Sequence, residues 1–290
     1  MLRLVCSLLG LLCPVTVLAT AGGVRIVAAE NFYGDIASQL AGPHARVASV
    51  LRNPDADPHL FETDVATARA VAEADLVIYN GLNYDVWMVR LLAGTRAPHR
   101  RVLEAASVLR QPPADGNPHI WYDLDAVEAL ARAIAGELQQ IDPAQEASYA
   151  ARLRRFSASL RPLRAEIARL RARYAGTPVA ATEPVANDLA AALGLQMRER
   201  RFQLAEMNAT EPSASDTAAF ERALKMRSVR VLIYNRQVTG GAVTRLLRIA
   251  RAAGVPVVGV TETEPAGLDY QHWMLGQLRA LEGALSGSRS

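Results

Sequence analysis

Short apolar runs alternate with segments of helical spacing through the first half of the chain. Runs rich in Val, Ile and Leu favour strands, and apolar residues at steps of three and four favour helices. The pattern predicts strands at 24–29, 45–51, 75–80 and 101–105, and helices at 32–40, 66–74 and 86–93. Strands that alternate with helices indicate βαβ units with parallel pairing.

The second half of the chain repeats this plan without repeating the sequence. The pattern predicts strands at 177–182, 229–235 and 255–261, and helices at 185–193, 213–226, 242–253 and from Tyr270 onward. The run Ser213-Ala-Ser-Asp216 is a capping box that begins one of these helices. The predicted fold class is therefore α/β, with an N-terminal lobe at 22–144 and a C-terminal lobe at 176–290. Each lobe is expected to hold a mainly parallel sheet flanked by helices.

The segment between the lobes, 145–175, has the most regular apolar pattern in the chain. Its apolar residues recur at alternating steps of three and four: Leu153, Phe156, Leu160, Leu163, Ile167, Leu170 and Tyr174. This stripe predicts a rigid linking helix about 45 Å long at 1.5 Å per residue. Pro162 falls inside the stripe, but the stripe keeps its phase, so we expect one kinked helix rather than two. A coiled-coil dimer seam is the alternative, although each sheet also needs an apolar cover.

The first residues of the chain have the pattern of a cleavable signal peptide. Arg3 precedes an apolar run, and small residues end at Ala21. This leader, residues 1–21, predicts export to the periplasm. The apolar run is too short to span a bilayer comfortably. A lipid-anchored protein would need a small residue before its cysteine, and Leu12 before Cys13 does not fit, so no lipid anchor is expected.

Composition narrows the chemistry that the mature protein can carry. Both cysteines, Cys6 and Cys13, lie in the leader, so a metal site must use imidazole and carboxylate ligands. The formal net charge is +3, and the charged residues are dispersed along the chain. This pattern is typical of a solvated surface and gives no indication of nucleic-acid binding.

Two histidines lie in loops that follow predicted strands. His59 ends the run Asn53-Pro-Asp-Ala-Asp-Pro-His59, and His119 ends Asn117-Pro-His119. Ligands of parallel α/β sheets collect beyond the carboxyl ends of strands, so both histidines are candidate metal ligands. A loop histidine on its own is more often a surface residue, and the matching context of the pair favours ligation. The other histidines, His44, His99 and His272, lack this context and are interpreted as structural or surface residues.

The second half has no histidine at a strand end, so its ligands are expected to be carboxylates. Glu183 and Glu262 each directly follow a predicted strand. A charged group at the end of a buried strand is costly without a partner, and a cation would supply one. The alternative is an acid that stabilises a helix N-terminus. Glu264 and Asp188 are the nearby substitutes.

Two imidazoles and two carboxylates form a mixed nitrogen and oxygen ligand set. Such a set suits Mn²⁺, Zn²⁺ or Fe²⁺ and argues against Cu(I), which prefers sulfur ligands. Because histidine binds metal only when neutral, affinity is expected to fall as the pH drops through roughly 6.

The chain resembles a known family, the zinc/manganese-type solute-binding proteins of bacterial metal ABC importers. The motifs that carry this resemblance span nearly all of the mature chain: Ala29-Glu-Asn-Phe-Tyr-Gly-Asp35, Asn53-Pro-Asp-Ala-Asp-Pro-His-Leu-Phe-Glu62, Asn80-Gly-Leu-Asn-Tyr-Asp85, Asn117-Pro-His-Ile-Trp121, Thr182-Glu-Pro-Val185, Thr210-Glu-Pro-Ser-Ala-Ser-Asp216, Tyr234-Asn-Arg-Gln237 and Val257-Val-Gly-Val-Thr-Glu-Thr263.

The resemblance implies two α/β lobes bridged by a rigid helix, with one metal ion held between them. It places the four ligands at His59, His119, Glu183 and Glu262. It further implies a membrane permease and its ATPase as partners. A carboxylate at Glu183 is typical of manganese members and favours Mn²⁺ slightly over Zn²⁺. The fourth ligand is commonly aspartate, so Glu262 departs from the pattern of the family.

Two other functions remain as alternatives, a metal-dependent hydrolase and a metal-binding adhesin of the same fold. Hydrolases usually keep an open metal position and a nearby general base, whereas four protein ligands would close the coordination sphere. His59-Leu-Phe-Glu62 resembles a His-x-x-Glu pair, but the chain has no His-Glu-x-x-His helix. We therefore expect a binding protein, not an enzyme, that is a monomer and binds no nucleic acid.

Overall fold

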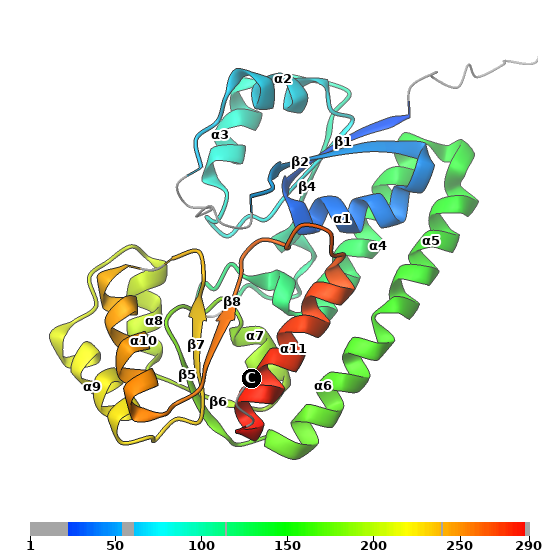
Figure 1. The fold of residues 1–290 in the computed structure, drawn as a ribbon. Helices are drawn as coiled ribbons and strands as arrows, with labels where there is room; N and C mark the ends of the chain where they lie inside the picture. Colours follow the sequence, from blue (N-terminus) through cyan, green and yellow to red (C-terminus); the bar gives the residue numbers. More distant parts are fainter. Residues whose placement is uncertain (1–22, 54–60, 114, 239, 288–290) are drawn as a thin grey trace, which may run out of the picture.

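Two four-stranded parallel sheets form the framework of the protein (Figure 1). The structure, a computed structural model, describes residues 23–53, 61–113, 115–238 and 240–287. The predicted leader and His59 lie outside these residues. The first sheet has the strand order β2-β1-β3-β4. Its strands are β1 (Val24–Glu30), β2 (Ala45–Leu51), β3 (Leu76–Tyr79) and β4 (Arg101–Glu104).

The second sheet has the same arrangement, with the order β6-β5-β7-β8. Its strands are β5 (Pro178–Ala181), β6 (Gln196–Arg198), β7 (Leu232–Asn235) and β8 (Val257–Val260). In both sheets the first strand lies between the second and the third, so the direction of winding reverses beside it. Such a reversal opens a crevice at the carboxyl ends of the strands, which is the usual place for a ligand.

Helices cover both sheets. Those of the N-terminal half are α1 (Asn31–Ala41), α2 (Val65–Glu73), α3 (Val86–Gly94) and α4 (Leu124–Ile141). Those of the C-terminal half are α7 (Asn187–Ala192), α8 (Arg200–Met207), α9 (Ala214–Lys225), α10 (Gly241–Ala253) and α11 (Tyr270–Ser286). Ser213 caps α9 as predicted, because its hydroxyl accepts from the backbone N–H of Asp216 at 3.1 Å. Gly254 ends α10 in the left-handed conformation that favours glycine.

The predicted two-lobe α/β fold is confirmed, and the predicted strands and helices have counterparts whose ends shift by a few residues. Among the observed α-helices and strands, three were not predicted: α4, β6 and α8. Helix α4 buries Val127, Leu130, Ile134 and Leu138, whose spacing is helical, so the signal was present in the sequence. Strand β6 is only three residues long and is largely exposed, so it carries almost no apolar pattern.

The linking segment consists of two helices, α5 (Glu146–Ser159) and α6 (Arg161–Tyr174), that run along one side of both lobes (Figure 1). The prediction of one kinked helix is therefore wrong in this detail. The two helices meet at Leu160, two residues before Pro162, which lies in the first turn of α6. Proline cannot donate to the carbonyl four residues earlier and crowds it, so the break comes at this point.

The apolar stripe of the linking helices is buried within the chain itself. Phe156, Leu160, Leu163 and Leu170 are at most 2% exposed. Helix α5 packs against α1 and α4, and α6 packs against α11. The stripe therefore covers the two lobes. It needs no second chain to bury it, as a coiled-coil dimer seam would.

An aromatic layer joins the two lobes beside the linking helices. The ring of Phe32 on α1 lies 4.6 Å from that of Trp121 and 5.8 Å from that of Trp273 on α11. The hydroxyl of Tyr270 donates to the carbonyl of Trp121 at 2.7 Å. These residues belong to one core cluster that runs from Val24 to Leu285, so the lobes share a core. Within the described residues, the helices are too short or too polar to cross a membrane.

Candidate metal-binding site

His119 lies at the carboxyl edge of the first sheet and faces the second lobe. It is 1% exposed, and its Nδ1 lies 2.6 Å from the Oδ1 of Asn117. Asn117 itself donates through Nδ2 to the carbonyl of Pro184, which fixes the amide with its oxygen toward the histidine. An amide oxygen only accepts, so Nδ1 carries a proton. Nε2 is therefore the nitrogen that remains for a ligand, as in many metal-binding histidines.

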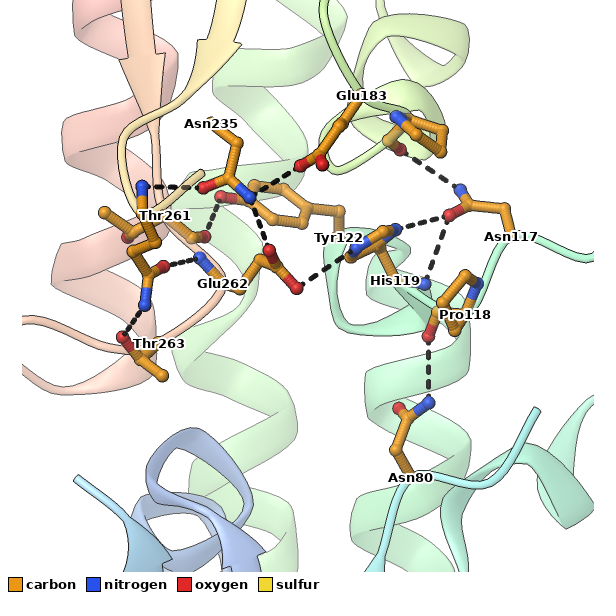
Figure 2. A network of polar contacts seen from close by, with 12 residues as sticks. Asn80, Asn117, Pro118, His119, Tyr122, Glu183, Asn235, Thr261, Glu262 and Thr263 are labelled. Carbon is orange, nitrogen blue, oxygen red and sulfur yellow. Dashed lines mark hydrogen bonds and ion pairs between the residues drawn. The ribbon is translucent and has the colours of Figure 1, made fainter. Parts of the chain in front are cut away.

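Glu262 faces that nitrogen from the other lobe. It follows β8, is fully buried, and its Oε2 lies 3.3 Å from Nε2 of His119 (Figure 2). The backbone N–H of Glu262 donates to Oε1 of Gln237 at 2.6 Å. One residue earlier, the carbonyl of Thr261 accepts from the hydroxyl of Tyr122 at 2.8 Å. The loop that carries Glu262 is thus held by side chains from both lobes.

Glu183 reaches the same place through a shared amide. It follows β5 and is 6% exposed. The Nδ2 of Asn235, the last residue of β7, donates to Oε2 of Glu183 at 2.6 Å and also to Oε1 of Glu262 (Figure 2). Three of the four predicted ligands, His119, Glu183 and Glu262, therefore converge at the reversal point of the second sheet.

The fourth predicted ligand, His59, lies outside the described residues. Among the residues that the structure describes, no group of three or more His, Cys, Asp or Glu side chains is spaced to hold a metal ion. Glu183 and Glu262 are connected to each other through the amide of Asn235, which donates to both. The four-ligand set therefore stays a prediction.

The nearby substitutes for these ligands are Glu264 and Asp188. Glu264 is at the junction of the lobes, where its backbone N–H donates to Oδ1 of Asn31 and its carbonyl accepts from Nδ2 of Asn31. Burial, with smaller contributions from Asp35 and Asp269, raises the pKa of Glu264 to about 9, so this carboxyl is protonated at neutral pH. Burial likewise raises the pKa of Asp188 to about 6. A protonated carboxyl is a poor metal ligand, which argues against Glu264, whereas Asp188 is largely ionised at neutral pH.

A second set of buried polar groups adjoins the site from the N-terminal lobe. Glu30, the last residue of β1, is fully buried. Burial and the neighbouring Asp85 carboxylate raise the pKa of Glu30 well above its usual value. Asp85 accepts from the backbone N–H of Asn80 at 2.5 Å and of Gly81 at 2.9 Å. Burial and Glu262 raise the pKa of Tyr84, so its hydroxyl stays protonated beside the site.

Sequence reasoning missed Glu30 and Asn235 as members of this region. Glu30 is a carboxyl at the end of a buried strand, so the criterion that selected Glu183 and Glu262 would have selected it too. Asn235 is neutral, and an amide at a strand end carries no comparable signal. It was seen in the sequence only as part of the Tyr234-Asn-Arg-Gln237 motif.

The remaining histidines are structural or surface residues, as interpreted from the sequence. Nε2 of His44 lies 3.3 Å from the hydroxyl of Ser148 on α5. His99 is more than half exposed and lies 4.0 Å from Asp75. His272 lies in the first turn of α11, and its Nδ1 is 2.6 Å from Oδ1 of the capping Asp269.

Comparison with known proteins gives this geometry its context. The model of the family described as zinc-uptake complex component A, periplasmic, matches residues 26–284. The manganese-binding lipoprotein MntA of Halalkalibacterium halodurans is 28% identical over 145 residues, which are 49% of this chain and 47% of that protein. A putative metal-binding protein of Thermotoga maritima is 36% identical over 101 residues, 35% of each chain. The chain thus matches about half or less of the length of these curated relatives.

Solved structures share the fold over nearly the whole chain. The periplasmic zinc-binding protein TroA of Treponema pallidum aligns with a TM-score of 0.76 and 19% identity, covering 91% of this chain and 99% of that one. The solute-binding protein FpvC of Pseudomonas aeruginosa, in complex with Mn²⁺, aligns with a TM-score of 0.76 and 22% identity, covering 92% and 100%. These likenesses show the two-lobe fold. Because the family model matches most of its length, the chain belongs to the family of the periplasmic component A of zinc-uptake complexes.

Proposed function

We propose that this protein captures a divalent transition-metal ion between its lobes and delivers it to an ABC import permease. The observation that carries the proposal is the pair His119 and Glu262, two buried groups from different lobes that face each other at 3.3 Å. Burying a charge is costly unless a partner offsets it, and a cation bound by both groups would do so. Glu183 adjoins them through Asn235, and the loop of His59 would supply the last ligand.

The cargo that this ligand set fits is Mn²⁺ or Zn²⁺. Imidazole and carboxylate groups accept both ions. The names of the relatives point the same way, since MntA is named for manganese and TroA for zinc. FpvC structures contain Mn²⁺ and Ni²⁺. The ion is cargo and is released to the permease, whose partner ATPase would drive transport.

The proposal includes a division of the chain and a place in the cell. Residues 22–144 form the N-terminal lobe, 145–175 the link and 176–290 the C-terminal lobe. The leader at 1–21 directs the protein to the periplasm and is then removed. Several relatives are named lipoproteins. Leu12 before Cys13 supports an unanchored protein here, and the protein is proposed to act as a monomer.

Movement between the lobes is proposed to be small. The hydroxyl of Tyr122 reaches from the first lobe to the carbonyl of Thr261, and Asn31 bonds twice to the backbone of Glu264. A wide hinge opening would break these bonds together with the contacts of the aromatic layer. A tilt that moves the β5 and β7 ends relative to His119 would keep them.

A metal-binding adhesin is the second candidate, favoured by one comparison. The laminin-binding protein Lmb of Streptococcus agalactiae, described as bifunctional with adhesin and metal-transporting activity, has the same fold with a TM-score of 0.76 and 21% identity. Catalysis is not proposed, because a closed set of four protein ligands would leave no position for a reacting water.

Elemental analysis of protein purified without added metal tests the proposed site. We expect about one equivalent of Mn or Zn per chain in the wild type and its loss in His119→Ala. His99→Ala is the matched control, since His99 is exposed and precedes β4, at the end of the sheet opposite the site. Equal metal content in wild type and His119→Ala would show that the site is elsewhere. Delivery is tested by metal uptake in cells that lack the gene. We expect the wild-type gene to restore uptake and the His119→Ala gene not to restore it.

A further inference from the structure

Asn117 is a buried amide that lies between His119 and the second lobe. It is 2% exposed. Its Oδ1 lies 2.6 Å from Nδ1 of His119 and accepts from the backbone N–H of His119 at 3.2 Å. Its Nδ2 donates to the carbonyl of Pro184 at 3.3 Å (Figure 2). Pro184 directly follows Glu183, so this amide connects a proposed ligand of the first lobe to the backbone beside a proposed ligand of the second.

The orientation of this amide follows from two backbone groups, one in each lobe. A carbonyl oxygen only accepts and a backbone N–H only donates. Turning the amide over would place its oxygen against the carbonyl oxygen of Pro184 and its NH₂ group against the N–H of His119. Neither backbone group changes its role with the protonation of the imidazole. Asn117 therefore presents an oxygen to Nδ1 for reasons that do not depend on the imidazole.

The loop around His119 is also held within the first lobe. The carbonyl of Pro118 accepts from Nδ2 of Asn80 at 3.0 Å. The imidazole packs edge-on against the rings of Tyr84 and Trp121, with ring centroids 5.9 and 5.2 Å away. These contacts fix where the ring lies, and the bond to Asn117 decides which of its nitrogens carries the proton.

We propose that Asn117 is a positioning residue that holds His119 in its metal-binding tautomer and makes this hold depend on contact between the lobes. The inference rests on the proposed function. With the lobes together, both backbone groups orient the amide, so the proton stays on Nδ1 and the lone pair of Nε2 points toward the proposed site. When the second lobe moves away, the bond to Pro184 is lost and only the N–H of His119 orients the amide. His119 is then held less firmly and binds the ion less tightly.

The consequence is that metal capture and contact between the lobes reinforce each other. A ligand shifts a conformational equilibrium only by its differential affinity for the two states. The closed arrangement holds the tautomer that the ion requires, so a bound ion favours that arrangement through Asn117. Separation of the lobes on the permease would weaken the hold on His119 and favour release. Asn117 acts through His119 and does not touch the cargo.

Nitrogen NMR of the His119 ring in the metal-free protein reads the tautomer directly. Wild type should carry the proton on Nδ1. Asn117→Asp keeps an oxygen that accepts from Nδ1 and should keep this tautomer, whereas Asn117→Ala removes the acceptor and should populate the tautomer with the proton on Nε2. A purely structural role of Asn117 would leave the tautomer unchanged in both variants. Asn187→Ala is the control, because it loses a bond to Gln203 within the second lobe and should have the wild-type tautomer.

The affinity for Zn²⁺, measured by competition with a chromophoric chelator, tests the consequence for binding. We expect Asn117→Ala to bind Zn²⁺ roughly 10- to 100-fold more weakly than wild type, the scale of outer-shell substitutions at metal sites. Asn187→Ala should bind Zn²⁺ as wild type does.

A double-mutant cycle tests the dependence on the second lobe. Pro184→Gly loosens the backbone whose carbonyl accepts from Asn117. An effect of Pro184→Gly on Glu183 that does not pass through Asn117 is the same in both backgrounds and cancels in the cycle. We expect the loss of Zn²⁺ affinity caused by Pro184→Gly to be at least roughly threefold larger with Asn117 present than in Asn117→Ala. Equal losses would overturn the dependence on the second lobe.

The remaining outcomes separate this inference from the proposed function. A proton on Nε2 in metal-free wild type would overturn the inference, and that measurement needs no variant. An Asn117→Ala variant with the wild-type tautomer or the wild-type Zn²⁺ affinity would overturn it as well and would leave the proposed function intact. If wild type and Asn187→Ala bind neither Zn²⁺ nor Mn²⁺, the proposed function itself fails and this inference fails with it.

Discussion

Tyr122 links the stability of the protein to the position of a proposed ligand. Its hydroxyl donates to the carbonyl of Thr261 at 2.8 Å, directly before Glu262 in the chain. Tyr122 is 1% exposed and Thr261 is 6% exposed, so water cannot replace the bond easily. Burial raises the pKa of Tyr122 far above its usual value, and the hydroxyl therefore remains a donor at every working pH.

Tyr122→Phe removes this donor with almost no change in volume. The substitution leaves a buried carbonyl without its partner, which costs about 1–3 kcal/mol. For chains of this size, 1 kcal/mol corresponds to a Tm change of roughly 2–4 °C. The metal-free variant should therefore melt several degrees below wild type. Because the backbone beside Glu262 is less restrained, metal affinity should also fall several-fold.

Tyr149→Phe is the matched control. The hydroxyl of Tyr149 donates to Asp142 at 3.0 Å, away from the proposed site, so its loss should lower Tm without changing metal affinity. Differential scanning calorimetry and isothermal titration calorimetry measure the two quantities. A Tyr122→Phe variant that loses stability but binds metal as wild type does would refute the link between this bond and Glu262. An unchanged Tm would refute the cost assigned to the orphaned carbonyl.

Three further predictions concern pH, the linking helices and metal removal. Burial raises the pKa of Glu264 from 4.5 to about 9. Between those pH values the folded state keeps a proton that the unfolded state releases, so this group lowers the free energy of unfolding as the pH rises. Glu264→Gln should flatten that decline in urea unfolding measured from pH 5 to 9, and an identical decline in the variant would contradict the assignment. Leu163 is 2% exposed, so Leu163→Ala should lower the free energy of unfolding by about 2–5 kcal/mol in the same assay. The molecular mass in solution should not change, whereas a dimer held by a coiled coil at this stripe would dissociate. Chelation should remove about 2.7 kcal/mol of stability if free metal had been at a hundred times its Kd, and His119→Ala should show no such response.

The elements of this fold could be predicted from the sequence wherever their signal is local. The strand predicted at 45–51 is observed as β2 over the same residues, and Ser213 caps α9 through a bond to a residue three positions away. Apolar periodicity reports which face of an element is buried, and that depends only on neighbours along the chain. Strand β6 and helix α8 lacked a strong pattern, because β6 is largely exposed and α8 buries only Phe202 and Gln203.

The site could be predicted in part, because the chemistry of a strand end is also visible locally. That reasoning selected His119, Glu183 and Glu262, and the structure brings these three together. It did not place Glu30 with them, although the same criterion applies to Glu30. It also had no means of choosing Asn235, a neutral residue that becomes important only because two carboxylates lie beside it.

The sequence by itself determined the α/β plan and the two lobes, and it predicted a site of imidazole and carboxylate groups, because each follows from residue type and short spacing. Only the tertiary structure decided which atoms meet. The bonds that join Asn235 to Glu183 and to Glu262 span 52 and 27 residues, and they depend on β5, β7 and β8 lying side by side in one sheet. Which oxygen of each carboxylate faces the amide is set by that packing, since no property of a glutamate in the chain distinguishes its two oxygens.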